Sequence, residues 1–172
     1  MLAKISFLVC CAFLANGAWV TKGGSANYQD PPSLPLYYFG RSSYYFQSFS
    51  TATQEQGVLF CKNLNMGLVS IESKQENDFL FETVGSLVDY EISTFWTSGL
   101  KNGATWYWVT TGKAFTYTNW AGDTPSNDTG NSLAVIQDST KMTMEWSETN
   151  SSEAYFVICE GEGAGNSTFS AN

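Results

Sequence analysis

The stretch "GLVSIESKQENDFL", residues 67–80, decides the fold because it predicts a strand followed at once by a helix. The apolar run at 68–71 is typical of a short buried strand. Ser73 and Glu76, three residues apart, form the capping-box pattern with which helices begin. Phe79, Leu80 and Val84 then follow at positions that suit a helix ending at Gly85.

A hairpin and a first helix are predicted upstream of this stretch. The aromatic segment "LYYFGRSSYYFQSF", residues 36–49, is broken at Gly40, which favours two strands joined by a turn. Thr51 and Gln54 form another capping-box pattern, and we expect a helix over 51–65 closed by a left-handed turn at Gly67. Its buried face is predicted from three residues at helical spacing: Val58, Cys61 and Leu64.

The second half of the chain changes to short β-rich pieces. These are "FWTSGL" (95–100), "TWYWVTTG" (105–112), "FTYTNW" (115–120), "LAVIQD" (133–138), "MTMEW" (142–146) and "YFVICE" (155–160). Two helices followed by short strands predict the α+β class, with the helices packed on a mostly antiparallel sheet and a long loop between strands.

The two ends of the chain differ from its centre. A lysine before a short apolar run and then small residues make 1–17 resemble a secretory signal peptide, with the mature chain beginning near Ala18 or Trp19. Prolines and glycines in 18–36 predict an extended leader, and 161–172 predicts a flexible Gly/Ser tail. The single domain is therefore expected over 37–160, in a protein that is secreted.

Composition excludes several classes of function. The 172 residues contain no histidine, so Ser-His-Asp and Cys-His catalysis and most zinc sites cannot be assembled, and we expect no enzyme. The net charge of −8 opposes binding to nucleic acid or insertion into an anionic membrane. Once the signal peptide is removed, Cys61 and Cys159 remain as an even pair in an oxidising compartment, which favours a disulfide over free thiols or metal ligation.

Several motifs together resemble the C-type lectin family over 37–160. They are "GLVSIES", "QENDFL", "FWTSGL", "WYWVTTGKAFTYTNW" and the closing "ICE", in this order. The phrases "FWTSG", "TTGK" and "TYTNW" are most similar to the secreted single-domain lectins of insects. The resemblance implies that Cys159 pairs back to Cys61 on the first helix. The tryptophans in these runs suit packing in a β-rich core better than stacking on sugars.

The resemblance also implies where a calcium and sugar site would lie. The ligand positions of sugar-binding relatives fall on Thr124 and Ser126, which flank Pro125, and on Asn131, Ser147 and Glu148. Only Glu148 keeps a carboxylate and only Asn131 an amide, whereas calcium takes six to eight oxygens. A shifted register would bring in Asp123, Asn127 and Asp128. The metal candidates are therefore Asp128, Asn131 and Glu148, for weak Ca²⁺ binding or none, and Pro125 is expected to shape the loop through a cis bond.

Two further expectations concern the same loop. A second disulfide of the family would fall near Leu133 and Ser151, neither of which is cysteine, so a buried Leu133 is expected to offset part of that loss. Sequons for N-glycosylation begin at Asn127, Asn150 and Asn166. A glycan on Asn127 would stand over the place where a relative holds its sugar.

These observations predict a secreted recognition protein of innate-immunity type that binds carbohydrate or another extracellular surface ligand, with most of the calcium ligands lost. The ligand-binding residues would be the loop and strand positions Thr124, Pro125, Ser126, Asn127, Asp128, Asn131, Ser147 and Glu148. The alternative is a metal-independent module that binds a protein partner, as an inhibitor, a receptor-like protein or a salivary or venom effector, because fold alone does not choose between them.

Overall fold

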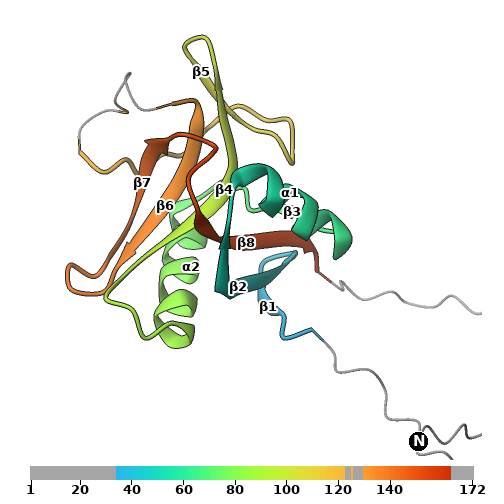
Figure 1. Cartoon of the computed structure of the whole chain (residues 1–172), viewed down its shortest axis with the longest axis vertical. Coiled ribbons are helices and arrows are strands. Elements are labelled where there is room, and N and C mark those ends of the chain that lie inside the picture. Colours follow the sequence, from blue (N-terminus) through green and yellow to red (C-terminus); the bar gives the residue numbers. More distant parts are fainter. Residues whose placement is uncertain (1–33, 123–124, 126–129, 164–172) are drawn as a thin grey trace, which may run out of the picture. The chain divides into compact units, whose positions relative to one another are not determined.

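A computed structural model describes residues 34–122, 125 and 130–163 (Figure 1). The elements follow in the order β1 (Tyr37–Phe39), β2 (Ser42–Ala52), α1 (Gln54–Asn63), β3 (Gly67–Leu68), α2 (Lys74–Leu87), β4 (Ile92–Asn102), β5 (Thr105–Trp108), β6 (Ser132–Asp138), β7 (Thr143–Thr149) and β8 (Tyr155–Glu162). Two helices and an extensive sheet confirm the predicted α+β class. The predicted signal peptide and leader, up to residue 33, lie outside the described residues.

The strands form one sheet in the order β1-β2-β8-β4-β6-β7, with β3 paired to β8 and β5 paired to β4. All these pairings are antiparallel except β4 with β8, which run parallel. The last strand is therefore inserted at the centre of the sheet, beside β2 and β4. This arrangement explains why segments far apart in the sequence lie side by side in Figure 1.

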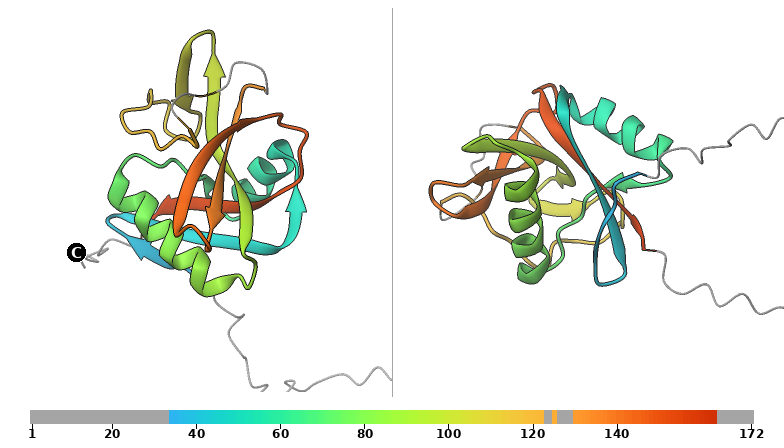
Figure 2. Two further views of the ribbon diagram at one scale, coloured as in Figure 1. Left: turned by 90° about the vertical axis from the view of Figure 1, so that its left-hand side faces the viewer. Right: turned by 90° about the horizontal axis from the view of Figure 1, so that it is seen from below.

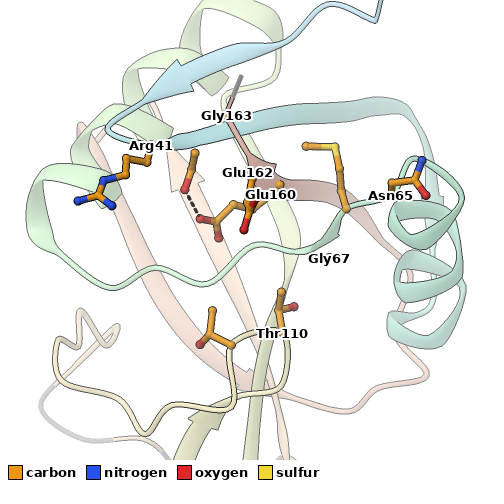
Figure 3. A pocket seen from close by; sticks show the side chains of 11 residues that line it. Arg41, Asn65, Gly67, Thr110, Glu160, Glu162 and Gly163 are labelled. Carbon is orange, nitrogen blue, oxygen red and sulfur yellow. Dashed lines mark hydrogen bonds between the residues drawn. The ribbon is translucent and has the colours of Figure 1, made fainter. Parts of the chain in front are cut away.

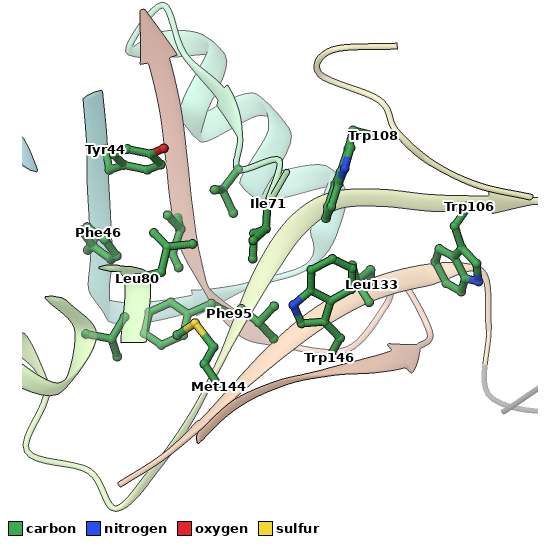
Figure 4. Packing of buried hydrophobic residues seen from close by; sticks show 14 residues of the cluster. Tyr44, Phe46, Ile71, Leu80, Phe95, Trp106, Trp108, Leu133, Met144 and Trp146 are labelled. Atoms are coloured by element: carbon green, nitrogen blue, oxygen red, sulfur yellow. The ribbon is translucent and has the colours of Figure 1, made fainter. Parts of the chain in front are cut away.

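The two helices cover opposite faces of the sheet (Figure 2). Successive residues of a strand point to alternate faces, so neighbouring residues contact different helices. On β4, Phe95 packs with Leu80 of α2, whereas the adjacent Trp96 packs with Cys61 of α1. On β8, Ile158 belongs to the α2 side and its two neighbours to the α1 side. The larger cluster, on the α2 side, contains Trp106, Trp108 and Trp146 (Figure 4). The prediction that most tryptophans pack in the core is confirmed.

The first helix begins two residues later than predicted. Its N-cap is Thr53, whose hydroxyl accepts from the amide of Gln56 while the Gln56 side chain accepts from the amide of Thr53. The predicted cap residue Thr51 belongs to β2 instead, because the sheet pairing extends to Ala52, opposite Tyr155. The prediction of a capping box is thus confirmed, but the predicted pair of residues, Thr51 and Gln54, was wrong.

The buried face of α1 also differs from the prediction. Val58 is 47% exposed, and the residues that face the sheet are Gln54, Gly57 and Cys61. A Cβ added to Gly57 would lie 3.3 Å from Val157, so glycine allows the helix to approach β8 closely. The left-handed turn after α1 occurs at Asn65, with φ 56°, and not at Gly67, which lies in β3.

The second helix begins at the predicted cap and runs two residues past the predicted end, to Leu87. The Ser73 hydroxyl accepts from the amide of Glu76, but the Glu76 carboxylate does not accept from the Ser73 amide, as a complete capping box would require. It accepts instead from the hydroxyl of Tyr44 at 2.7 Å and from the amide of Glu72 at 2.8 Å. Burial raises the pKa of Glu76 to about 7, although the two hydrogen bonds oppose that shift.

The predicted strand at 115–120 is wrong. The strand pairing of this segment is limited to an isolated bridge from Trp120 to Trp146. Its aromatic side chains pack against the larger core cluster. The ring of Phe115 lies 4.1 Å from that of Trp108, and the ring of Trp120 lies 5.1 Å from that of Trp106. The segment is thus held by aromatic packing, with bonds from the Ala121 amide to the Trp146 carbonyl and from the Trp146 amide to Asn119.

The predicted disulfide is present and joins α1 to β8. Cys61 and Cys159 are bonded with their Cα atoms 5.3 Å apart and their side chains fully buried. Strand β8 continues to Glu162, and the Gly163 amide donates to the Arg41 carbonyl, so the first residues of the predicted tail belong to the domain. Residues 164–172 lie outside the described part. Across the described residues, neither helix has the length and apolar character that crossing a bilayer requires.

Candidate functional site

The positions predicted to bind a ligand are divided between the long loop and the neighbouring strands. Thr124, Ser126, Asn127 and Asp128 lie outside the described residues, and so does the bond that joins Thr124 to Pro125. Pro125 itself is half-buried. The three remaining positions belong to β6 and β7 or to the residue just before them, and the structure shows where their side chains go.

Ser147 and Glu148 are adjacent on β7 and therefore point to opposite faces of the sheet. Glu148 shares the buried face with Met144 and Trp146, and its side chain is only 1% exposed. Ser147 is half-buried on the other face, where its hydroxyl contacts the backbone carbonyl of Glu148 at 3.4 Å. The pair does not present two oxygen side chains toward one point.

The Glu148 carboxylate is bound by a cation that the chain itself supplies. The Lys101 ammonium, on β4, donates to Oε1 of Glu148 at 3.1 Å, and the lysine side chain is 14% exposed. The same ammonium lies 5.8 Å from the centre of the Trp106 ring. The Lys101 amide also donates to the Asn131 carbonyl at 2.8 Å, so this lysine joins the two predicted ligand positions. An ammonium thus neutralises the one carboxylate kept at the described ligand positions.

Sequence reasoning missed Lys101 because its role depends on strand pairing. Leu100 pairs with Ser132 across β4 and β6, and Leu133 pairs with Glu148 across β6 and β7. Two strand crossings therefore bring Lys101 to Glu148, although 47 residues separate them in the sequence. The only local signal is one basic residue in a strand that is otherwise largely buried.

Trp106 contributes an unusual polar group beside this ion pair. The residue is 9% exposed, and its indole N–H is buried without a hydrogen-bond partner among the described residues. Leaving a buried donor unpaired costs about 1 to 3 kcal/mol. This N–H belongs to the same indole ring that the Lys101 ammonium faces.

The position of the missing second disulfide is filled by an apolar contact. Leu133 is fully buried on the α2 side of the sheet, as predicted. It packs so closely on Gly99 that a Cβ there would lie 2.7 Å from the Leu133 Cβ. At the other end of β7, Asn150 is exposed, but its side-chain oxygen accepts from the Ser152 amide and hydroxyl. The sequons at Asn127 and Asn166 lie outside the described residues.

The described residues do not form a set that fits calcium. Nowhere in 34–122, 125 and 130–163 do three or more His, Cys, Asp or Glu side chains gather as a metal site would require. Calcium prefers several carboxylate and carbonyl oxygens around one point. Here Glu148 is paired with Lys101, Ser147 points to the other face, and the Asn131 carbonyl accepts from a backbone amide. These three positions do not fit the metal that the family pattern implies.

A second concave region lies on another part of the domain and was not predicted. This cleft of about 730 Å³ is bordered by β8, the 65–67 turn and the 110–111 turn (Figure 3). Its central acid, Glu160, accepts from the Ser42 hydroxyl at 2.7 Å and from the Ser70 amide at 3.0 Å. Burial raises the pKa of Glu160. The Arg41 side chain points away from this carboxylate in Figure 3.

Comparison with known families agrees with this geometry. The family model described as Lectin C-type domain matches residues 50–161, which is most of the described part. The chain belongs to the C-type lectin family. The match begins in β2 and ends in β8, so it covers both helices, the disulfide and the long loop.

Individual relatives support the assignment. Rabbit (Oryctolagus cuniculus) E-selectin is 29% identical over 121 residues, which cover 68% of this chain but only 21% of the E-selectin. The chain therefore spans about a fifth of that relative's length. C-type lectin mosGCTL-7 of the mosquito Aedes aegypti is 29% identical over 108 residues, covering 59% of this chain and 71% of the mosquito protein.

A solved structure shares the fold at lower identity. The Ca²⁺-independent C-type lectin SPL-2 from Saxidomus purpuratus aligns with a TM-score of 0.64 and 22% identity. The alignment covers 78% of this chain and 95% of SPL-2. At this identity the likeness shows the fold alone, and it confirms the predicted C-type lectin-like architecture.

Proposed function

We propose that this C-type lectin is a secreted recognition protein whose domain binds extracellular carbohydrate without calcium. The observation that carries the proposal is the contact between Lys101 and Glu148. An internal ammonium supplies the positive charge that a metal would bring to this carboxylate. The site would therefore keep its local charge balance without metal.

The ligand would be held by direct hydrogen bonds at the long loop and the adjacent strands. The Trp106 N–H lacks a partner but is buried, so it would donate to a sugar hydroxyl oxygen only after the side chains that cover it move aside. Thr124, Ser126, Asn127, Asp128 and Asn131 would add side-chain hydroxyl, amide and carboxylate groups from the loop, with Pro125 and Ser147 completing the predicted set. We expect such a site to bind and not to catalyse, since the chain lacks histidine.

Secretion supports the choice of ligand. The predicted signal peptide and the buried disulfide both suit an oxidising extracellular compartment, where glycans are displayed. SPL-2, which shares the fold, is itself called a calcium-independent lectin. The mass of the secreted chain after deglycosylation should correspond to a start near Ala18 or Trp19, and a retained Met1 would contradict the assignment.

The direct experiment is a glycan array probed with enzymatically deglycosylated protein, once with millimolar calcium and once with a chelator. We expect the same glycans to bind under both conditions. Binding that disappears in chelator would show that the loop carboxylates of Asp123 and Asp128 hold calcium after all. If no glycan binds under either condition, the result favours the alternative that the domain binds a protein.

A thermal measurement tests the calcium part separately. At 1 mM calcium the free energy of unfolding should change by less than about 0.5 kcal/mol, since a site with a millimolar dissociation constant adds only that much. A shift of several degrees in Tm that Asp128→Asn or Asn131→Ala abolishes would contradict the proposal. Chelator added to the same sample provides the control.

A further inference from the structure

A small apolar cleft separates helix α1 from the segment that follows β5. It shares Met66, Gly67 and Thr110 with the larger polar cleft, and Figure 3 shows the last two at that common border. The volume of the apolar cleft is about 270 Å³. The residues that shape it include Val58, Lys62, Leu68, Leu100, Val109 and Thr110.

The walls of this cleft present apolar surface to water. Val58 on α1 is 47% exposed and Val109 after β5 is 52% exposed. Between them lie Leu68, which is 2% exposed and forms part of the core, and Leu100. Apolar surface of this kind gains free energy when a hydrocarbon chain displaces the water, at about 25 cal/mol per Å².

The polar groups of the lining are already satisfied within the protein. The Gln54 amide donates to the Thr97 carbonyl at 3.2 Å and accepts from the Ser132 hydroxyl at 2.8 Å. The Thr110 hydroxyl donates to the Leu68 carbonyl at 2.8 Å. The cleft therefore selects a ligand whose inserted part makes no hydrogen bonds.

The one charged group of the lining is Lys62, at the end of α1. It lies four residues after Val58, so the two side chains emerge one above the other on the same face of the helix. Within the described part of the chain, Lys62 takes part in no ion pair. An ammonium without an ion-pair partner beside an apolar cleft favours a ligand with an anionic end, against the repulsion from the net charge of −8 of the whole protein.

We propose that this cleft binds a free fatty-acid anion of medium length, with its chain between Val58 and Val109 and its carboxylate on Lys62. The volume holds roughly nine carbon atoms at about 30 Å³ each, which suits a fatty acid of eight to ten carbons whose carboxylate stays outside the cleft. The site uses none of the residues assigned to carbohydrate, so it stands or falls independently of that function.

Isothermal titration of the full secreted protein with decanoate tests the proposal. We expect saturable binding of one decanoate per chain, with a Kd on the order of 0.1 mM for a ligand of this size. Decyltrimethylammonium, which has the same chain length and the opposite charge, should bind at least fivefold more weakly. The net negative charge of the protein would by itself give the reverse preference.

Two variants locate the site. Val109→Asp places a carboxylate in the wall and should weaken decanoate binding at least tenfold, because a charge is costly against a hydrocarbon chain. Lys62→Gln should weaken it about threefold to fivefold and remove the preference for decanoate over the cationic probe. Leu59→Asp is the matched control, since Leu59 is 55% exposed on the same helix but does not line the cleft.

Several results would overturn the proposal. They are the absence of saturable decanoate binding to folded wild-type protein, equal binding of both probes, or binding that Val109→Asp leaves unchanged while circular dichroism shows a native fold. A monomer-to-dimer equilibrium that only Val109→Asp abolishes would assign the cleft to a second copy of the chain instead. Loss of binding in Leu59→Asp alone would place the ligand elsewhere on α1.

Discussion

Two regions of the sheet are stabilised by different chemistry. Around α1 and β8, the Cys61–Cys159 bond joins residues 98 apart in the sequence and fixes the helix to the sheet covalently. Around β6 and β7, where the family resemblance implies a second disulfide and a metal, the chain uses a buried Leu133 and the contact between Lys101 and Glu148. The first solution is independent of solvent, whereas the second depends on packing and on charge. We therefore expect the two regions to respond differently to the same perturbation.

The largest effect should come from removing the covalent link. In the chain-entropy model, a closed loop of about a hundred residues contributes about 4 to 5 kcal/mol. Replacing both cysteines, Cys61→Ala with Cys159→Ala, should lower the free energy of unfolding by about that amount in urea denaturation. Wild-type protein denatured under reducing conditions provides the control and should show a similar loss. A change below about 1 kcal/mol would mean that the disulfide contributes little to the free energy of unfolding beyond the contribution of packing.

The next largest effect should come from the apolar substitute for the second disulfide. Leu133→Ala removes a fully buried side chain and should cost about 3.5 kcal/mol, since buried leucine-to-alanine changes cost about 2 to 5. Native-state hydrogen exchange should show faster opening in β6 and β7 and little change around Cys159. Uniform acceleration in both regions would contradict the idea that they open separately.

Breaking the internal ion pair should cost slightly less. Lys101→Met leaves the Glu148 carboxylate buried without its cation, which should destabilise the domain by about 3 kcal/mol. The double variant Lys101→Met with Glu148→Leu should recover most of that loss, and a double-mutant cycle measures the coupling. The matched control is Lys74→Met, which breaks the exposed pair with Asp78 and should cost no more than about 0.5 kcal/mol.

A pH titration should give the smallest of these effects, on the α2 side of the sheet, where Glu76 accepts a hydrogen bond from Tyr44. Burial raises the pKa of Glu76 from its ordinary 4.5 to about 7, so between these values the folded state binds more protons than the unfolded state. The resulting stabilisation is fully present below about pH 4.5 and is lost as the pH rises through 7. The shift corresponds to at most about 3.4 kcal/mol. Relaxation of the fold around the charged carboxylate reduces this figure, so we expect the free energy of unfolding to fall by about 2 kcal/mol over this range.

Glu76→Gln should flatten that pH dependence, because the group no longer titrates. Glu82→Gln, at an exposed position of the same helix, should leave the wild-type profile unchanged. A profile that keeps its slope in Glu76→Gln would assign the titration to another buried acid, of which Glu160 is the first to test.

The sequence predicts those parts of the fold that depend on local chemistry. The caps of both helices, the hairpin before α1 and most of the strands follow from patterns of neighbouring residues. The register of the α1 cap does not, because "TATQEQ" offers both Thr51 with Gln54 and Thr53 with Gln56. The choice is made by the pairing of Ala52 with Tyr155, a contact between segments about a hundred residues apart.

The candidate site was predictable only as a list of positions. The sequence identified Glu148 as the carboxylate that remains, but its partner Lys101 lies two strands away in the sheet. The exposure of Val58 was missed for a related reason, since Gly57 takes the buried position through close approach and not through hydrophobicity. Distant pairing and close backbone approach leave little trace in a hydrophobic pattern.

The pairing of β2 with β8 also determines how the domain would respond to mechanical tension. Ser42 at the start of β2 lies opposite Glu162 at the end of β8, so a force pulling the chain apart at these two points would separate the strands one hydrogen bond at a time. On β8 that unzipping stops at Cys159, whereas the chain of β2 and α1 can be drawn out as far as Cys61. Between these two cysteines the disulfide closes the chain into a covalent ring. The long loop, Lys101 and Glu148 all lie inside that ring, where tension on the ends of the chain cannot extend them.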